Sequence, residues 1–170
     1  GLRHEFASYF HEEVFELQNQ EVRDFLVDTS ILDELSPAAC AAVISNAKAR
    51  NILEQAFEDG LFLSDLDREL SRYRYHTLFR EMVLGRLMRR APERATELHR
   101  RASTYFVETG DLSRALEHAM LCGDKIFLAD QLELLAEPMT YSGLLYRIDE
   151  LASDLPWELL EPLLHSLEVV

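Results

Sequence analysis

The chain has 170 residues, of which 48% are apolar and 28% are charged, so it can bury a hydrophobic core and is neither disordered nor low-complexity. It carries 17 Lys and Arg against 31 Asp and Glu, a net charge of −14 that disfavours general binding to nucleic acid or anionic membranes. No apolar run approaches the ~20 residues that cross a bilayer, and no signal-peptide core is present, so we expect a soluble, cytoplasmic protein with no membrane partner.

Apolar residues recur at helical spacing through the first sixty residues. One stripe lies in residues 6–17 and a second in residues 22–29. Ser36-Pro37 is an N-cap followed by proline at the first helical position, which predicts a third helix. A fourth, around residues 52–57, is expected to end at Asp59-Gly60, since glycine readily adopts the left-handed conformation that ends helices.

The helical period breaks after Gly60. Leu61–Leu63 is a compact apolar run, Ser71–Tyr75 alternates polar and aromatic residues, and the polar residues 65–70 between them favour a turn. Two β-prone segments around a turn predict a β-hairpin.

Helical periodicity resumes after His76, and Ala91-Pro92 marks a further helix start. Short helices then follow one another, separated at Gly110-Asp111 and Gly123-Asp124, and the last begins at Pro156. Helix–Gly-Asp–helix units of this kind are typical of α-solenoids such as tetratricopeptide (TPR) arrays. The apolar ending Leu167–Val170 lacks a polar capping helix, so we expect the array to be truncated.

Helices, one hairpin and a further helix follow one another in the order of a winged-helix fold. We therefore expect a mainly α protein with a winged-helix regulatory domain in residues 1–90, containing one short β-hairpin, followed by a TPR-like α-helical array in residues 91–170.

Positive charge is concentrated in one part of the sequence. Between Arg68 and Arg101 there are ten arginines and four glutamates, a local charge of +6, which leaves −20 for the rest of the chain. Arginine presents a planar fork of donors that suits phosphate, so this stretch is a candidate phosphate site. The alternative is that most of these arginines lie on solvated faces and pair with the surrounding acidic helices.

Signatures of catalysis are missing. No GxGxxG, GxxxxGK[ST] or GxSxG motif occurs, so the chain is not expected to be an enzyme. Cys40 and Cys122 lie far apart and are expected to be free thiols. His4 and His11 do not have the spacing of a metal site, and none is predicted.

His76 is the one candidate binding residue. It follows the second predicted strand and precedes a helix, where exposed backbone N–H groups favour anions and an imidazole can add a hydrogen bond to a phosphate. A lone histidine at such a place can equally be a packing residue.

A winged helix can also bind DNA through a recognition helix in the major groove. The candidate recognition helix, Asn51–Asp59, is acidic and has no Arg or Lys to read base edges. We therefore expect no direct DNA binding by this chain.

Four segments, in this order, carry a family resemblance. They are VRDFLVDTSILDELSPAAC (residues 22–40), LEQAFEDGLFLSDLD (53–67), YRYHTLFREMVLGRL (73–87) and LHRRASTYFVETGDLSRALEHAMLCGD (98–124). Over roughly residues 9–135 the chain resembles the large ATP-dependent LuxR-type transcriptional regulators of the MalT kind. Members of that family carry a STAND-class nucleotide-binding domain with a P-loop, then a winged helix, a helical-repeat sensor and a DNA-binding helix-turn-helix.

The resemblance implies that this chain is the winged helix and the start of the repeats, without the P-loop or the helix-turn-helix. His76 and Leu78 are similar to the Met-His-Asp motif of related switch ATPases, whose histidine reaches the β-phosphate of bound ADP; Tyr75 and Thr77 replace the methionine and the aspartate. ATP or ADP is thus implied for the full-length protein and no cofactor for this chain alone. The implied partners are the upstream nucleotide-binding domain and an inducer or protein bound to the repeats.

Two functions from different classes follow. The first is a regulatory fragment of an ATP-dependent LuxR-type transcriptional activator, whose winged helix gates the nucleotide-binding domain while the repeats relay a signal. The alternative is a helical scaffold that binds a partner protein through its acidic helices and has no link to nucleotide.

Overall fold

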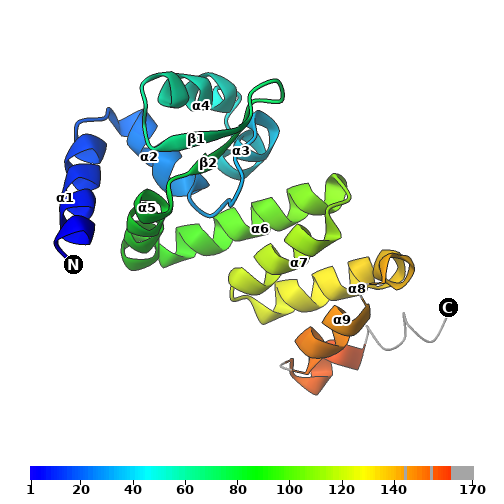
Figure 1. Cartoon of the computed structure of the whole chain (residues 1–170). Coiled ribbons are helices and arrows are strands. Elements are labelled where there is room, and N and C mark those ends of the chain that lie inside the picture. Colours follow the sequence, from blue (N-terminus) through cyan, green and yellow to red (C-terminus); the bar gives the residue numbers. More distant parts are fainter. Residues whose placement is uncertain (144, 154, 162–170) are drawn as a thin grey trace. The chain divides into compact units, whose positions relative to one another are not determined.

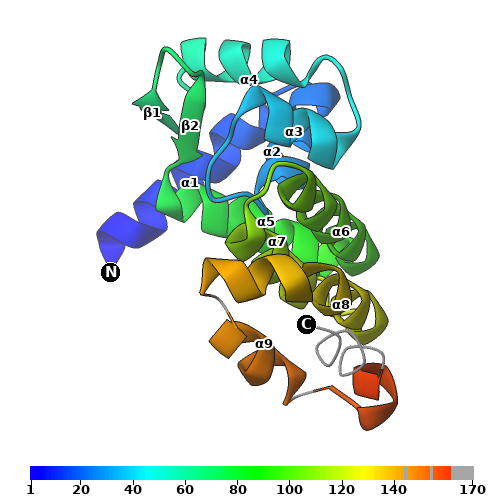
Figure 2. The same cartoon turned by 90° about the vertical axis from the view of Figure 1, so that its right-hand side faces the viewer.

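The computed structural model describes residues 1–143, 145–153 and 155–161 (Figures 1 and 2). The chain folds into two compact units, one formed by residues 1–102 and the other beginning at Ser103. No helix among the described residues is long and apolar enough to cross a membrane. The elements in chain order are α1 (Leu2–Glu16), α2 (Gln20–Thr29), α3 (Pro37–Ile44), α4 (Ala49–Glu58), β1 (Leu63–Asp67), β2 (Arg72–Tyr75), α5 (Thr77–Arg90), α6 (Pro92–Glu108), α7 (Leu112–Leu121), α8 (Lys125–Ser142) and α9 (Leu145–Ala152).

Helix ends fall where the local sequence predicts them. The Ser36 side chain accepts a hydrogen bond from the backbone N–H of Ala39 at the start of α3. Gly60 has a φ of 69°, a conformation that suits glycine and follows the end of α4. The predicted start at Pro92 is also confirmed, because α6 begins there.

The predicted hairpin is confirmed, with β1 and β2 antiparallel and Leu63 opposite Tyr75. The boundaries of its first strand were predicted wrongly: β1 begins at Leu63 and runs to Asp67, so much of the expected polar turn is strand. Phe62 lies before the strand with a φ of 57°, which places it in a turn after α4. The ring of Phe62 stacks on that of Phe79 with centroids 4.4 Å apart, so tertiary packing sets this boundary.

Strand β2 is attached to the helices at two points. Tyr73 and Leu35 exchange two backbone hydrogen bonds of 2.9 and 2.8 Å, so the segment after α2 acts as a short third strand. At the end of β2, the Tyr75 hydroxyl lies 2.7 Å from that of Thr29, and both residues are buried. Figure 1 shows the hairpin beside α3 and α4, leading directly into α5.

The core of the first unit is apolar and continuous across these elements. Its fully buried side chains include Leu26, Leu32, Leu35, Val43, Leu53, Phe79, Val83 and Leu98. Cys40 is buried in the same unit, and burial raises the pKa of its thiol to about 12, so it stays protonated and unreactive. Both cysteines are free, as expected.

The second unit is helical throughout its described residues. The chain turns back between α7 and α8 at Gly123, whose φ is 72°, and these two helices pack side by side (Figure 1). Ser103 donates a buried hydrogen bond to the carbonyl of Ala115, which joins the end of α6 to α7. Leu159 and Leu160 follow Pro156 in a described helical segment, whereas Leu163, Leu164 and Leu167 of the last predicted stripe lie outside the described residues. The likeness to TPR arrays and the division at residue 90 stay predictions.

The Thr29–Tyr75 contact should contribute measurably to the stability of the first unit. Thr29 donates its proton to the carbonyl of Phe25 at 2.7 Å, so Tyr75 is the donor to Thr29. Tyr75→Phe removes one hydrogen bond and should lower the free energy of unfolding by about 1 kcal/mol. Thr29→Val leaves the buried Tyr75 hydroxyl without an acceptor and should lower it by about 1–3 kcal/mol. Urea unfolding of both single variants and the double variant tests this. Additive costs would show that the two hydroxyls do not interact.

Acidification should destabilise the first unit through His99. Burial lowers the pKa of His99 to about 4, with a smaller contribution from Arg80, whereas the unfolded chain has the ordinary value near 6.5. Between these two pH values the unfolded state binds more protons than the folded state. The free energy of unfolding is therefore highest above about pH 6.5, and it falls by on the order of 2 kcal/mol as the pH is lowered toward about 4. We expect His99→Gln to flatten this slope in urea unfolding, with His4→Gln as the exposed control. Equal slopes in wild type and His99→Gln would contradict the assignment.

Candidate functional site

His76 lies at the junction of strand β2 and helix α5, where the sequence predicts it. Its backbone N–H donates to the carbonyl of Phe62 at 2.8 Å, and its own carbonyl accepts from Arg80 N–H at 2.9 Å. Its side chain is exposed and forms no capping hydrogen bond with the helix. The backbone is therefore fixed while the imidazole is available to a ligand, together with the N-terminus of α5.

His11 of α1 lies near His76, an approach that no pattern in the sequence predicts. Its ring packs edge-on against Phe62 and Phe79, at centroid distances of 4.6 and 5.9 Å. Its Nδ1 is buried with no hydrogen-bond partner among the described residues. Burial lowers the pKa of His11, and the nearby imidazole of His76 lowers it further. The start of α5 thus has one exposed histidine and one partly buried, preferentially neutral histidine.

Much of the arginine-rich stretch forms ion pairs with acidic residues of the first unit. The pairs are Arg72–Glu34, Arg80–Asp33, Arg86–Glu16, Arg94–Asp28 and Arg101–Glu97. Several of them join elements far apart in sequence, so these arginines hold helices together as well as supplying charge. The prediction that arginines pair with the surrounding acidic helices is confirmed for Arg86, which pairs with α1, and Arg94, which pairs with α2.

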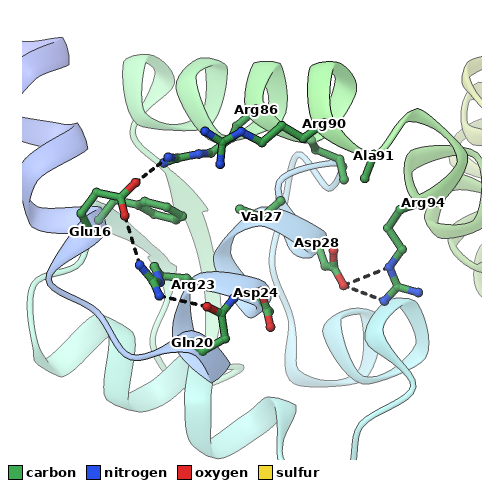
Figure 3. A pocket seen from close by; sticks show the side chains of 12 residues that line it. Glu16, Gln20, Arg23, Asp24, Val27, Asp28, Arg86, Arg90, Ala91 and Arg94 are labelled. Carbon is green, nitrogen blue, oxygen red and sulfur yellow. Dashed lines mark hydrogen bonds and ion pairs between the residues drawn. The ribbon is translucent and has the colours of Figure 1, made fainter.

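A second candidate site lies at the other end of α5. A pocket of about 330 Å³ is formed by α1, α2, the end of α5 and the start of α6, all within the first unit (Figure 3). It is lined by Phe15, Glu16, Gln20, Arg23, Asp24, Val27, Asp28, Arg86, Leu87, Arg90, Ala91 and Arg94. Its four arginines and three carboxylates make a formal charge of +1 in a strongly acidic chain.

Ion pairs occupy the two ends of this pocket (Figure 3). At one end Glu16 accepts from both Arg86 and Arg23, and the hydrogen bond from Arg86 holds the pKa of the Glu16 carboxyl below its ordinary value. At the other end Arg94 donates through Nε and Nη2 to a single oxygen of Asp28, at 3.2 and 2.6 Å. The sequence pointed to the arginines of α5 and α6, but not to Arg23 or the carboxylates that join them.

Helix α4, which contains most of the candidate recognition helix, contributes Ile52, Leu53 and Ala56 to the core. Its Arg50 is paired with Glu54 on the same helix, four residues away.

No group of three or more His, Cys, Asp or Glu side chains suited to a metal ion occurs among the residues that the structure describes.

The amino-acid sequence of this chain matches a known protein family. Residues 11–95 match the family described as the MalT winged helix domain. The chain is 35% identical over 130 residues to the serine/threonine-protein kinase PknK of Mycobacterium tuberculosis, covering 76% of this chain and 11% of the kinase. It is 35% identical over 121 residues to the HTH-type transcriptional regulator MalT of Vibrio cholerae, covering 71% of this chain and 13% of that protein. The corresponding regulator of Vibrio parahaemolyticus is 30% identical over 152 residues, covering 89% and 17%.

The chain spans less than a fifth of the length of each of these relatives. The matched range, residues 11–95, is half of the chain and extends from within α1 to the first turn of α6. It therefore contains the hairpin, His76 and the residues that line the arginine-rich pocket. This chain belongs to the family of MalT winged helix domains.

Proposed function

We propose that this chain is a regulatory segment of a MalT-type, ATP-dependent LuxR family transcription regulator, and that His76 contacts the diphosphate of a nucleotide held by an upstream domain. The observation that carries the proposal is the exposed imidazole of His76 at the uncapped start of α5. The family match includes this position.

The surroundings of His76 suit an anion. The first N–H groups of α5 have no side-chain cap, and the positive end of the helix dipole lies beside the imidazole. The rest of a nucleotide site would have to come from another domain, because this sequence has no phosphate-binding loop.

A regulatory role also fits the two kinds of relative. One is named a kinase and another a DNA-binding transcriptional regulator, and this chain aligns with a similar small share of each. A segment shared by a protein named a kinase and a protein named a transcriptional regulator is better suited to regulating such activities than to carrying out phosphorylation or DNA binding itself. We therefore assign the chain no catalysis of its own, and we place promoter binding and nucleotide hydrolysis elsewhere in a cytoplasmic regulator. The helices from α6 onward would form the TPR-like sensor for an inducer or protein partner.

Replacing His76 should weaken nucleotide retention in the full-length protein. The His76 side chain is exposed and forms no capping hydrogen bond with α5, so His76→Ala should fold normally. Loss of a hydrogen bond to a phosphate should speed ADP dissociation about tenfold and raise transcription without inducer. ADP release by stopped flow and a promoter-reporter assay measure the two effects.

The control is His4→Ala, an exposed histidine at the start of α1. His76→Asn, which keeps a donor, should fall between wild type and His76→Ala. Unchanged ADP release and unchanged basal transcription in His76→Ala would leave the helical scaffold without nucleotide linkage as the better description.

A further inference from the structure

We propose that the arginine-rich pocket at the C-terminal end of α5 binds a small phosphate monoester through Arg86, Arg90 and Arg94. The 14 residues of α5 span about 20 Å, and they place this pocket at the opposite end of the helix from His76. The proposal therefore does not depend on the nucleotide contact of His76, and the two can fail separately.

Arg90 has donors that no protein group uses. It lines the pocket, its side chain is exposed, and it forms no hydrogen bond or ion pair with the residues that the structure describes. Its neighbour Arg89 differs, because the Arg89 guanidinium lies over Gly85 of the same helix and does not line the pocket. A guanidinium at the edge of a concave, positively charged site is a ready ligand for a phosphate oxygen.

The paired arginines also retain donors. A guanidinium has five N–H groups, whereas Arg86 gives one nitrogen to Glu16, and Arg94 directs two nitrogens to a single oxygen of Asp28. Arg86, Arg90 and Arg94 follow one another at intervals of four residues along the end of α5 and the start of α6, and all three line the same pocket. A tetrahedral group bound to Arg90 can also accept from the donors that Arg86 or Arg94 retains.

Two of the three arginines are held in place before any ligand arrives. The guanidinium of Arg86 lies 4.8 Å from the centroid of the Phe15 ring, and its side chain is only 16% exposed. Asp28, which fixes Arg94, is 17% exposed. Because Arg86 and Arg94 are already held, the conformational entropy lost on anion binding comes mainly from the Arg90 side chain.

The size and charge of the pocket favour a small phosphorylated compound. A volume of about 330 Å³ is at the lower end of ligand pockets, enough for a phosphate with a short organic group. Arginine outnumbers carboxylate there by one, and the Asp24 carboxylate accepts a 2.6 Å hydrogen bond from Gln20. An anionic ligand meets a net positive charge there, and its largest gain comes from Arg90, whose charge no carboxylate of the described residues offsets.

The proposal can be tested by titrating the 170-residue chain with inorganic phosphate at constant ionic strength. Binding is followed in ¹H–¹⁵N spectra that include the arginine Nε–Hε signals. We expect saturable shifts at Arg86, Arg90 and Arg94. Arg90→Ala should weaken the apparent affinity about tenfold, and Arg90→Lys less, since it keeps the charge and loses the fork. The matched control Arg89→Ala, which removes the same charge one residue away, should change the affinity less than about twofold.

Succinate at the same concentrations separates phosphate recognition from docking of carboxylates. Stronger binding of phosphate than of succinate supports the proposal. Equal or stronger binding of succinate, a similar loss in Arg89→Ala and Arg90→Ala, or no saturable shift up to about 50 mM phosphate would each overturn it, and the arginines would then serve only to hold four helices together.

Discussion

The hairpin depends on two backbone hydrogen bonds between Tyr73 of β2 and Leu35 in the segment after α2. A two-stranded hairpin alone is marginally stable in water, so this additional bridge and the buried Thr29–Tyr75 contact keep the hairpin in one place. Strand β2 leads directly into α5, and the position of His76 therefore follows from how β2 is held. His76 has an exposed side chain and a fixed backbone because Tyr73 and Tyr75, which precede it in β2, are both buried.

The sequence predicted the helices of this fold because their ends are determined locally. Ser36-Pro37, Asp59-Gly60 and Ala91-Pro92 act through capping and backbone conformation within a few residues, and each marks a helix end in the structure. The start of β1 was missed because it depends on a distant partner. Phe62 looks like a strand residue in sequence, but its stacking on Phe79 places it in a turn with a positive φ.

In the candidate sites, too, features set by neighbouring residues could be predicted from the sequence, whereas contacts between distant residues could not. The placement of His76 between strand and helix was predictable from neighbouring residues. Its approach to His11, 65 positions earlier in the sequence, was not, and neither was the pairing of Arg86 with Glu16, 70 residues away. The spacing of arginines along α5 and α6 was visible, but a pocket exists only because α1 and α2 supply the opposite wall. No periodicity along one helix carries that information.

The contacts around His76 also determine how a ligand there would act on the protein. Arg80, in the turn of α5 that follows His76, donates to the carbonyls of Ser30 and Ile31 and pairs with Asp33 at 2.9 Å. That segment leads to Leu35, Leu35 holds Tyr73, and β2 returns to His76, so the contacts form a closed ring.

Such a ring leaves little freedom for the hairpin to move against the helices, because displacing the start of α5 would break the hydrogen bonds of Arg80 or those of Leu35. A contact made by His76 would therefore act on the hairpin, the segment after α2 and the start of α5 together. Under the proposed function, switching between two states would then depend on how the first unit attaches to the proposed nucleotide-binding domain, and not on movement of the hairpin against the helices.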